Sequence, residues 1–192
     1  LTEVVKTTNP KDMDALLATK HGNLTIKEIQ TAILAKIGEN LGVRRFSRNA
    51  VDGTKKIAQY IQTGSKIGVD VVFDDPNGKL DNATAREVAM HVAAMHPQYV
   101  NRSVVPADVL AKEKEIMLAQ MGDMKKPPEV MDKIVMGKIN KFFTEVCLDD
   151  QLYVRDPDGK ASVSGWLKKI DGGIKIVSFV RLQVGEGMEK KA

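Results

Sequence analysis

Two pairs of adjacent carboxylates have the side-chain type that general acid–base catalysis requires. Asp74-Asp75 and Asp149-Asp150 both stand in turn-like sequence, where aspartate is favoured because its side chain hydrogen-bonds the local backbone. General acid–base catalysis by these pairs stays open as the alternative, but no constellation of catalytic residues supports it. The pairs are therefore interpreted as turn residues, and the sequence predicts a protein that is not an enzyme.

The histidines and the cysteine also lack the spacing that chemistry demands. His91 and His96 are five positions apart, so they do not share a helix face, and no glutamate supports them in a zinc pattern. His91 is interpreted first as a histidine at the edge of the core. Cys147 follows an apolar stripe with no base beside it, which favours a buried thiol over a nucleophile. No metal site and no cofactor are predicted.

Glycine-rich phosphate loops are missing in their complete form. Gly159-Lys160 is followed by Ala161, where a phosphate-binding loop needs serine or threonine. Gly185-Glu186-Gly187 lacks the third glycine and the following helix of a dinucleotide site. The sequence therefore predicts no direct nucleotide binding, and together these observations favour a binding protein.

Composition bounds the remaining classes. The chain has 192 residues, 43% of them hydrophobic, and a net charge of +4, which suits one medium domain or two small ones. No apolar run approaches the roughly 18 residues that a membrane span needs. The single cysteine cannot form an internal disulfide, which indicates a reducing compartment.

The elements that position these side chains begin with a helical part over residues 1–50. Thr25 and Glu28 have capping-box spacing and predict a helix start, and Gly38 predicts its end. One face of this helix carries isoleucines at helical intervals and is expected to be buried: Ile26, Ile29, Ile33 and Ile37.

Beyond residue 50 the apolar period changes from helical to alternating. Alternation over 57–73, interrupted by Thr63-Gly64-Ser65, predicts a β-hairpin with one buried face. A helix over 85–95, a short helix over 162–170 and a strand over 174–184 follow. The expected fold class is α+β, with an antiparallel sheet core and flanking helices.

Residues 101–148 predict an inserted arm. Two apolar stripes at helical spacing lie on either side of Pro127-Pro128, which cannot continue a helix. Two helices of about 15–18 residues, each roughly 22–27 Å long, are expected to pair as an antiparallel helical hairpin, a coiled-coil arm. Its methionine-rich stripe suits helix pairing or an adaptable partner surface near the tip.

Five groups of segments, in order, resemble the elongation factor Ts family across nearly the whole chain. They are Ala35–Asn40 with Arg44-Arg45-Phe46, Gly64–Val69, Ala89–Pro97, Lys126–Glu129 with Lys138–Phe142, and Ser178–Arg181 with Val184–Gly187. The resemblance implies an exchange factor for elongation factor Tu that promotes GDP release by stabilising the nucleotide-free state. It also implies a bacterial cytoplasm or an organelle matrix or stroma.

The resemblance further implies a domain division. Residues 1–50 would be the helical part of an incomplete N-terminal core subdomain, 51–100 with 149–188 the C-terminal α+β subdomain, 101–148 the arm and 189–192 a basic tail. The partner-binding residues expected from motif position are those at the hairpin tip, one on the following helix and those at the arm tip: Gln62, Thr63, Gly64, His91, Lys125, Lys126 and Pro127.

Two departures from the family pattern qualify these expectations. The family's opening three-helix domain and its Thr-Asp-Phe-Val segment precede the part matched here. We therefore expect the 1–50 part to lack strands, and we expect binding to the partner with much reduced exchange activity. The family often has a histidine where this chain has Gln62. Glutamine keeps a hydrogen-bonding side chain but cannot become charged.

An alternative function stays open at this stage. A ribosome- or RNA-associated module derived from the same fold would use basic pairs as phosphate contacts: Lys55-Lys56, Lys168-Lys169 and Lys190-Lys191. The other interpretation of these pairs is solvated surface, which the mild net charge favours.

Overall fold

A computed structural model describes residues 1–38, 41–121 and 128–187. The expected basic tail 189–192 and the pair Lys190-Lys191 lie outside these ranges. The chain divides into two compact units, Leu1–Ala50 and Val51–Ala192. Each unit is described by itself.

The N-terminal unit is mainly helical because each helix has a local start or stop. The Asp12 carboxylate accepts from the Ala15 N–H at the start of the second helix. Thr25 and Glu28 form the predicted capping box, and Gly38 ends that helix with φ +74°. The elements are α1 (Thr2–Thr8), α2 (Met13–Ala18), β1 (Lys20–His21), β2 (Leu24–Thr25) and α3 (Ile26–Ile37).

Two expectations for this unit are wrong. Strands β1 and β2 form a minimal antiparallel ladder, although no strand was expected here. On α3 only Ile26 is buried, whereas Ile33 is 43% and Ile37 53% exposed. The fully buried apolar side chains of this unit come mainly from α1, α2 and the first turn of α3, so the far end of the isoleucine stripe has no cover among the described residues.

The second unit is built on a three-stranded antiparallel sheet of order β3-β4-β5, formed by β3 (Lys55–Ile61), β4 (Ile67–Asp74) and β5 (Lys175–Gln183). The predicted alternation over β4 places Val69, Val71 and Phe73 on one buried face. A register irregularity between Val72 and Phe73 adjusts the pairing with β5.

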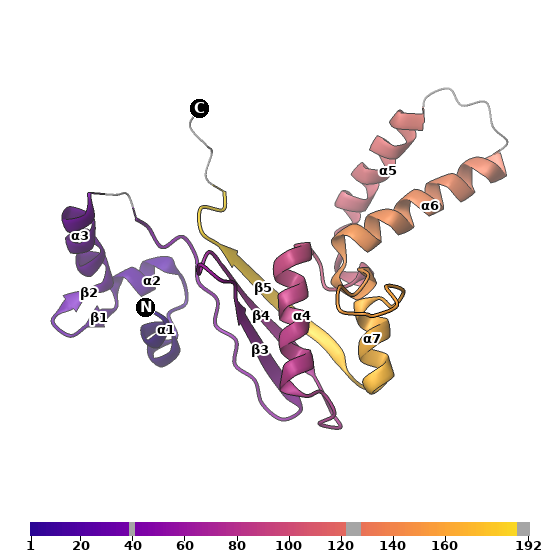
Figure 1. Cartoon of the computed structure of the whole chain (residues 1–192). Helices are drawn as coiled ribbons and strands as arrows, with labels where there is room; N and C mark the ends of the chain where they lie inside the picture. Colours follow the sequence, from indigo (N-terminus) through magenta and orange to yellow (C-terminus); the bar gives the residue numbers. More distant parts are fainter. Residues whose placement is uncertain (39–40, 122–127, 188–192) are drawn as a thin grey trace. The chain divides into compact units, whose positions relative to one another are not determined.

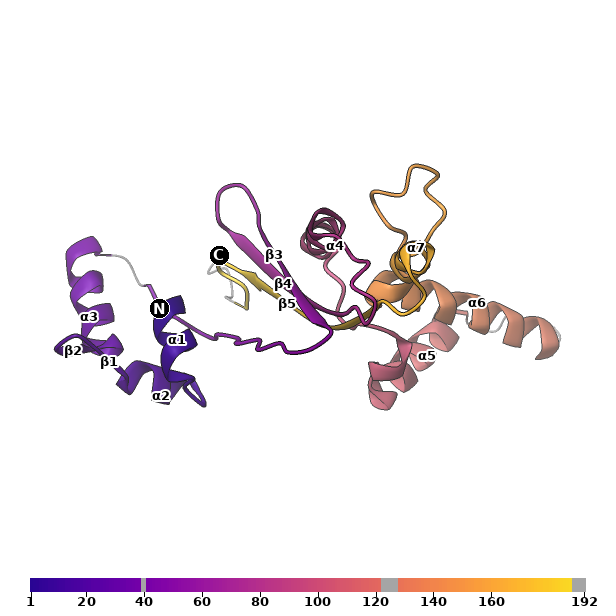
Figure 2. The same ribbon diagram turned by 90° about the horizontal axis from the view of Figure 1, so that it is seen from below.

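Helix α4 (Asn82–Met95) lies along one face of this sheet, as Figures 1 and 2 show, and packs on β3 and β4. Val88, His91 and Val92 share its fully buried face, as the spacing predicts. Helix α7 (Val163–Ile170), capped by Ser162, completes this core through Val163 and Leu167.

The arm follows α4 and consists of α5 (Ala107–Met121) and α6 (Pro128–Val146). The two helices contact each other and converge toward the base of the arm, as Figure 1 shows. Short 3₁₀ turns, η1 (Arg102–Val104) and η2 (Leu148–Asp150), stand at its base. An apolar cluster that includes Leu110, Ile139 and Phe143 fills that base.

The α+β fold class with antiparallel strands is therefore confirmed. Among the helices of the described ranges, none combines the length and apolar character that crossing a bilayer requires.

Candidate partner-binding surface

The tip of the β3–β4 hairpin exposes three of the residues expected to bind a partner. Gln62, Thr63 and Gly64 are all exposed. The Gln62 N–H donates to the Ile67 carbonyl at 2.9 Å, and the Ser65 N–H donates to the Gln62 carbonyl at 2.8 Å. Gly64 has φ +88°, a backbone conformation that favours glycine. The tight turn thus fixes the tip while leaving its side chains available.

Two apolar side chains border this tip. Ile61, the last residue of β3, is 69% exposed. Val184 follows β5 and is also exposed, and its N–H donates to the Lys66 carbonyl at 2.8 Å. The end of the sheet therefore offers apolar surface together with the amide of Gln62, a combination that suits a protein partner.

His91 lies in the core, not on the surface. Its side chain is fully buried, and both ring nitrogens are engaged. The Val154 N–H donates to Nδ1 at 3.3 Å, so the ring proton lies on Nε2, which faces Gln151 Oε1 at 3.0 Å. Burial lowers the pKa of His91, opposed by the Gln151 hydrogen bond. The imidazole is therefore a neutral connector between α4 and the segment after η2.

That segment, 151–155, presents two exposed apolar side chains. Leu152 is 57% and Val154 51% exposed. Gln151, which precedes them, and Tyr153, which lies between them, are buried. Glu87 of α4 fixes the other end of the segment, accepting from the Tyr153 hydroxyl at 3.3 Å and from Arg155 at 2.9 Å. The backbone is thus held on both sides of Val154.

The sequence reasoning missed Leu152 and Val154. Their alternation with Gln151 and Tyr153 was a usable indication that the two aliphatic residues share a face. Alternation alone would turn the aliphatic pair inward and Gln151 outward. His91 reverses this because it gives the Gln151 amide a buried partner, and the Gln151 Nε2 also donates to the Glu145 carbonyl at 2.8 Å.

The remaining expected contacts, Lys125, Lys126 and Pro127 at the arm tip, lie outside the described residues. The hairpin tip and the His91 connector both belong to the second unit. The hairpin tip is exposed, whereas the His91 side chain is buried.

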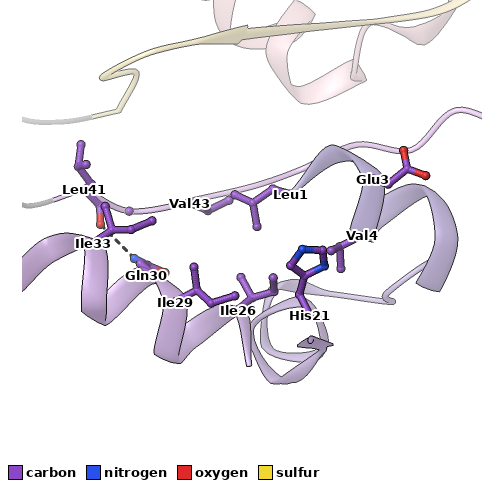
Figure 3. A pocket seen from close by; sticks show the side chains of 11 residues that line it. Leu1, Glu3, Val4, His21, Ile26, Ile29, Gln30, Ile33, Leu41 and Val43 are labelled. Atoms are coloured by element: carbon purple, nitrogen blue, oxygen red, sulfur yellow. Dashed lines mark hydrogen bonds between the residues drawn. The ribbon is translucent and has the colours of Figure 1, made fainter. Parts of the chain in front are cut away.

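A separate apolar groove of about 510 Å³ lies within the N-terminal unit. Figure 3 shows Ile26 and Ile29 of α3 facing Leu1 and Val43 across it. The sequence analysis did not predict this groove. Its lining is mostly aliphatic, and its polar side chains are Glu3, His21 and Gln30. It offers apolar contact, and its few polar groups do not form a catalytic arrangement.

The other groups with possible chemistry lie near the base of the arm. Cys147 is fully buried, and burial with nearby Asp150 raises the pKa of its thiol to about 11, so it is not a thiolate at neutral pH. Burial and Asp150 raise the pKa of Asp149 to about 6. Within the described ranges no group of three or more histidine, cysteine or acidic side chains is placed to hold a metal ion.

Comparisons with known proteins agree along the chain. The family model described as Elongation factor TS matches residues 1–186. Elongation factor Ts of Lactiplantibacillus plantarum is 40% identical over 183 residues, covering 95% of this chain and 60% of that protein. The protein of the same name from Nautilia profundicola is 41% identical and covers 100% of this chain and 66% of its own length.

A third relative, elongation factor Ts of Legionella pneumophila, is 44% identical over 167 residues, which are 87% of this chain and 53% of that protein. The chain thus spans between about half and two thirds of the length of these relatives. Because the family model extends over nearly every residue and the fold agrees with the expected architecture, the chain belongs to the elongation factor Ts family.

Proposed function

We propose that this chain binds elongation factor Tu and promotes release of GDP by stabilising the nucleotide-free state of that protein. The observation that carries the proposal is the family match over residues 1–186. The exposed hairpin tip supports it, because it presents the positions that family motifs associate with the partner. We place this activity in translation elongation, in the bacterial cytoplasm or an organelle matrix.

The proposed contact surface has two described parts in the second unit and one part in the arm. Gln62, Thr63 and Gly64 contact the partner from the hairpin tip. Leu152 and Val154 add an apolar contact, and His91 is a positioning residue that holds them. Lys125, Lys126 and Pro127 are proposed contacts at the arm tip.

The proposed mechanism needs no catalytic residue and no bound nucleotide on this chain. A protein that binds the empty partner more tightly than the GDP-loaded partner lowers the affinity of that partner for GDP by the same factor. A coupling of about 1.4 kcal/mol changes the affinity tenfold. The mechanism requires only that the exposed side chains of this chain bind the empty partner more tightly than the GDP-loaded partner.

Stopped-flow release of a fluorescent GDP from elongation factor Tu, with and without the 192-residue chain, tests the proposal. We expect release to accelerate as the chain is added and to saturate. If release does not accelerate, competition with an intact exchange factor decides which half of the proposal fails. Competition without acceleration overturns the exchange activity alone, and the absence of both overturns the whole proposal.

The Gly64→Val variant tests the role of the hairpin tip in the same experiment. At φ +88° a β-branched residue is strained, so the hairpin tip is distorted while the sheet beneath it keeps its pairing. We expect half-maximal acceleration of GDP release to need a several-fold higher concentration of the variant than of the parent chain. If both need the same concentration, the hairpin tip is not part of the contact surface.

A further inference from the structure

The base of the arm is fastened to the body by a short run of backbone pairing. The N–H groups of Gln98 and Tyr99 donate to the Val146 carbonyl at 2.8 and 3.0 Å, and the Leu148 N–H donates to the Tyr99 carbonyl at 2.9 Å. These bonds hold two crossing segments of the chain together, residues 98–99 and residues 146–148, at the point where α6 ends. The side-chain contacts at this crossing then bear on the angle between the arm and the body.

Arg102, in the 3₁₀ turn η1, makes side-chain contacts on both sides of this crossing. Its Nε and a terminal nitrogen approach Asp150 Oδ1 of η2 at 3.0 and 2.9 Å. Its other terminal nitrogen donates to Asn140 Oδ1 of α6 at 3.0 Å. The guanidinium carbon lies 4.8 Å from the centre of the Phe143 ring, also on α6.

The planar Arg102 side chain therefore connects helix α6 with the turn η2, which follows the end of α6. Asn140 and Phe143 belong to the arm helix, whereas η2 packs against α7 of the body. A guanidinium suits this place because its rigid fork donates in several directions at once and its face stacks on an aromatic ring. A lysine ammonium is a compact charge on a flexible stem, so it does not supply the rigid planar fork.

The energy of these contacts is modest, so geometry is their main effect. The Arg102 side chain is 46% exposed and that of Asp150 23% exposed, and ion pairs near the surface contribute about 0.2–1 kcal/mol. The apolar cluster at the base supplies adhesion between α5, α6 and residues outside the two helices such as Tyr99 and Cys147. Adhesion by apolar contact is not directional, whereas two hydrogen bonds, an ion-pair contact and a ring contact to one rigid group are.

We propose that Arg102 is a positioning residue that fixes the angle of the α5–α6 arm on the body of the second unit. The ion pair of Arg155 with Glu87, which has the same 2.9 Å distance, lies within the body and does not connect to the arm. Insofar as the arm tip contacts elongation factor Tu, this inference rests on the proposed function. The arm angle itself does not depend on it.

Energy transfer within the chain measures an arm-to-body distance that changes with this angle. Trp166, the single tryptophan, lies on α7 of the body and is the donor. The acceptor is a dye on a cysteine placed at Lys133, an exposed position on α6. Cys147 does not compete for the dye because it is fully buried and its pKa is about 11. Time-resolved donor decay gives the distribution of arm-to-body distances in the absence of any partner.

We expect a narrow distribution for the parent chain and a broader, shifted one for Arg102→Met and Arg102→Lys. The lysine variant keeps the charge, so it decides the test if the methionine variant does not fold. Lys141→Met is the matched control, because among the described residues Lys141 forms its ion pair with Glu145 on the same helix at 3.8 Å and its loss leaves the crossing intact. An unchanged distribution in a folded Arg102 variant overturns the proposal.

Affinity for elongation factor Tu is the second measurement. An arm of loosened angle loses freedom on binding, so we expect Arg102→Lys to bind several-fold more weakly and Lys141→Met to bind like the parent. If the parent chain does not bind elongation factor Tu, the proposed function fails while the distance distribution still tests the arm angle. If Arg102→Lys broadens the distribution but binds normally, the arm angle is confirmed and its role in binding is overturned.

Discussion

At the scale of single residues, the second unit shows how a motif histidine can matter without touching a partner. His91 is fully buried, and its two nitrogens hold Gln151 and the backbone of Val154. A charged imidazole at this site has no acceptor at Nδ1 and would repel the Val154 N–H. Neutrality of His91 is therefore a condition for the geometry of the segment.

This neutrality predicts a dependence of stability on pH. Because the pKa of His91 in the folded chain is below the value of about 6.5 in the unfolded chain, the unfolded state takes up the proton first as the pH falls. The contribution of His91 is fully present above about pH 6.5 and is lost below it, by on the order of 1 kcal/mol for each pH unit between the two pKa values.

Urea unfolding, followed by Trp166 fluorescence at pH 7.5 and 5.0, measures this contribution. Asp149 opposes it, because a folded-state pKa of about 6 means that the folded chain takes up this proton first as the pH falls. The comparison with His91→Gln removes that opposing effect, since Asp149 is common to both proteins. We expect the stability difference between parent and variant to shrink at pH 5.0. A difference that is constant over this range would contradict the prediction.

At the scale of elements, what matters is how a helix and a loop present surface. Helix α4 contributes Glu87 and His91, four positions apart and hence on one face, and the two hold the 151–155 segment at both ends. The segment then has only its outward side chains free to contact a partner. This arrangement places Leu152 and Val154 on a rigid support, which reduces the entropy lost on binding.

Replacing Leu152 and Val154 together by serine should weaken binding to elongation factor Tu. We expect a loss of about tenfold or more, because burial of a large aliphatic side chain is worth roughly 1.5–3 kcal/mol, and little change in the thermal midpoint, because both side chains are exposed. Val177→Ser on β5, also at an exposed aliphatic position, is the control. Equal affinities for the double variant and the parent would remove the segment from the contact surface.

At the scale of the whole molecule, the chain is two compact units joined near Ala50 and Val51. The stretch 41–54 has no regular secondary structure and is mostly exposed. Backbone of this kind opens to a protease without breaking a sheet or a helix, whereas cleavage in β3 requires the sheet to open first.

Limited digestion with trypsin should therefore cut after Arg44, Arg45 or Arg48 well before it cuts after Lys56 in β3. We expect a rate roughly tenfold faster or more at the former sites, because local opening there costs little. Mass spectrometry of the early fragments identifies the cut sites. Cleavage at Lys56 that keeps pace with cleavage at Arg48 would show that the sheet is not the more stable part.

Local chemistry by itself determined much of this molecule. The capping box at Thr25 and Glu28, the stop at Gly38, the alternation over β4 and the proline that begins α6 each act through neighbours in sequence, so their elements were predictable. The motifs that resemble elongation factor Ts also lie in the sequence, and the family match confirms them.

Tertiary structure alone decided which apolar faces found cover and which polar groups found partners. Ile33 and Ile37 repeat the pattern of a buried stripe, yet burial needs an opposing surface, and a helix sequence does not specify one. Gln151 is buried and Leu152 exposed because His91, sixty residues earlier, supplies a hydrogen bond. The positioning role proposed for Arg102 likewise depends on its contacts with Asn140 and Asp150, which are distant in the sequence. Contacts between distant residues depend on the packing of whole elements, which periodicity along the chain does not encode.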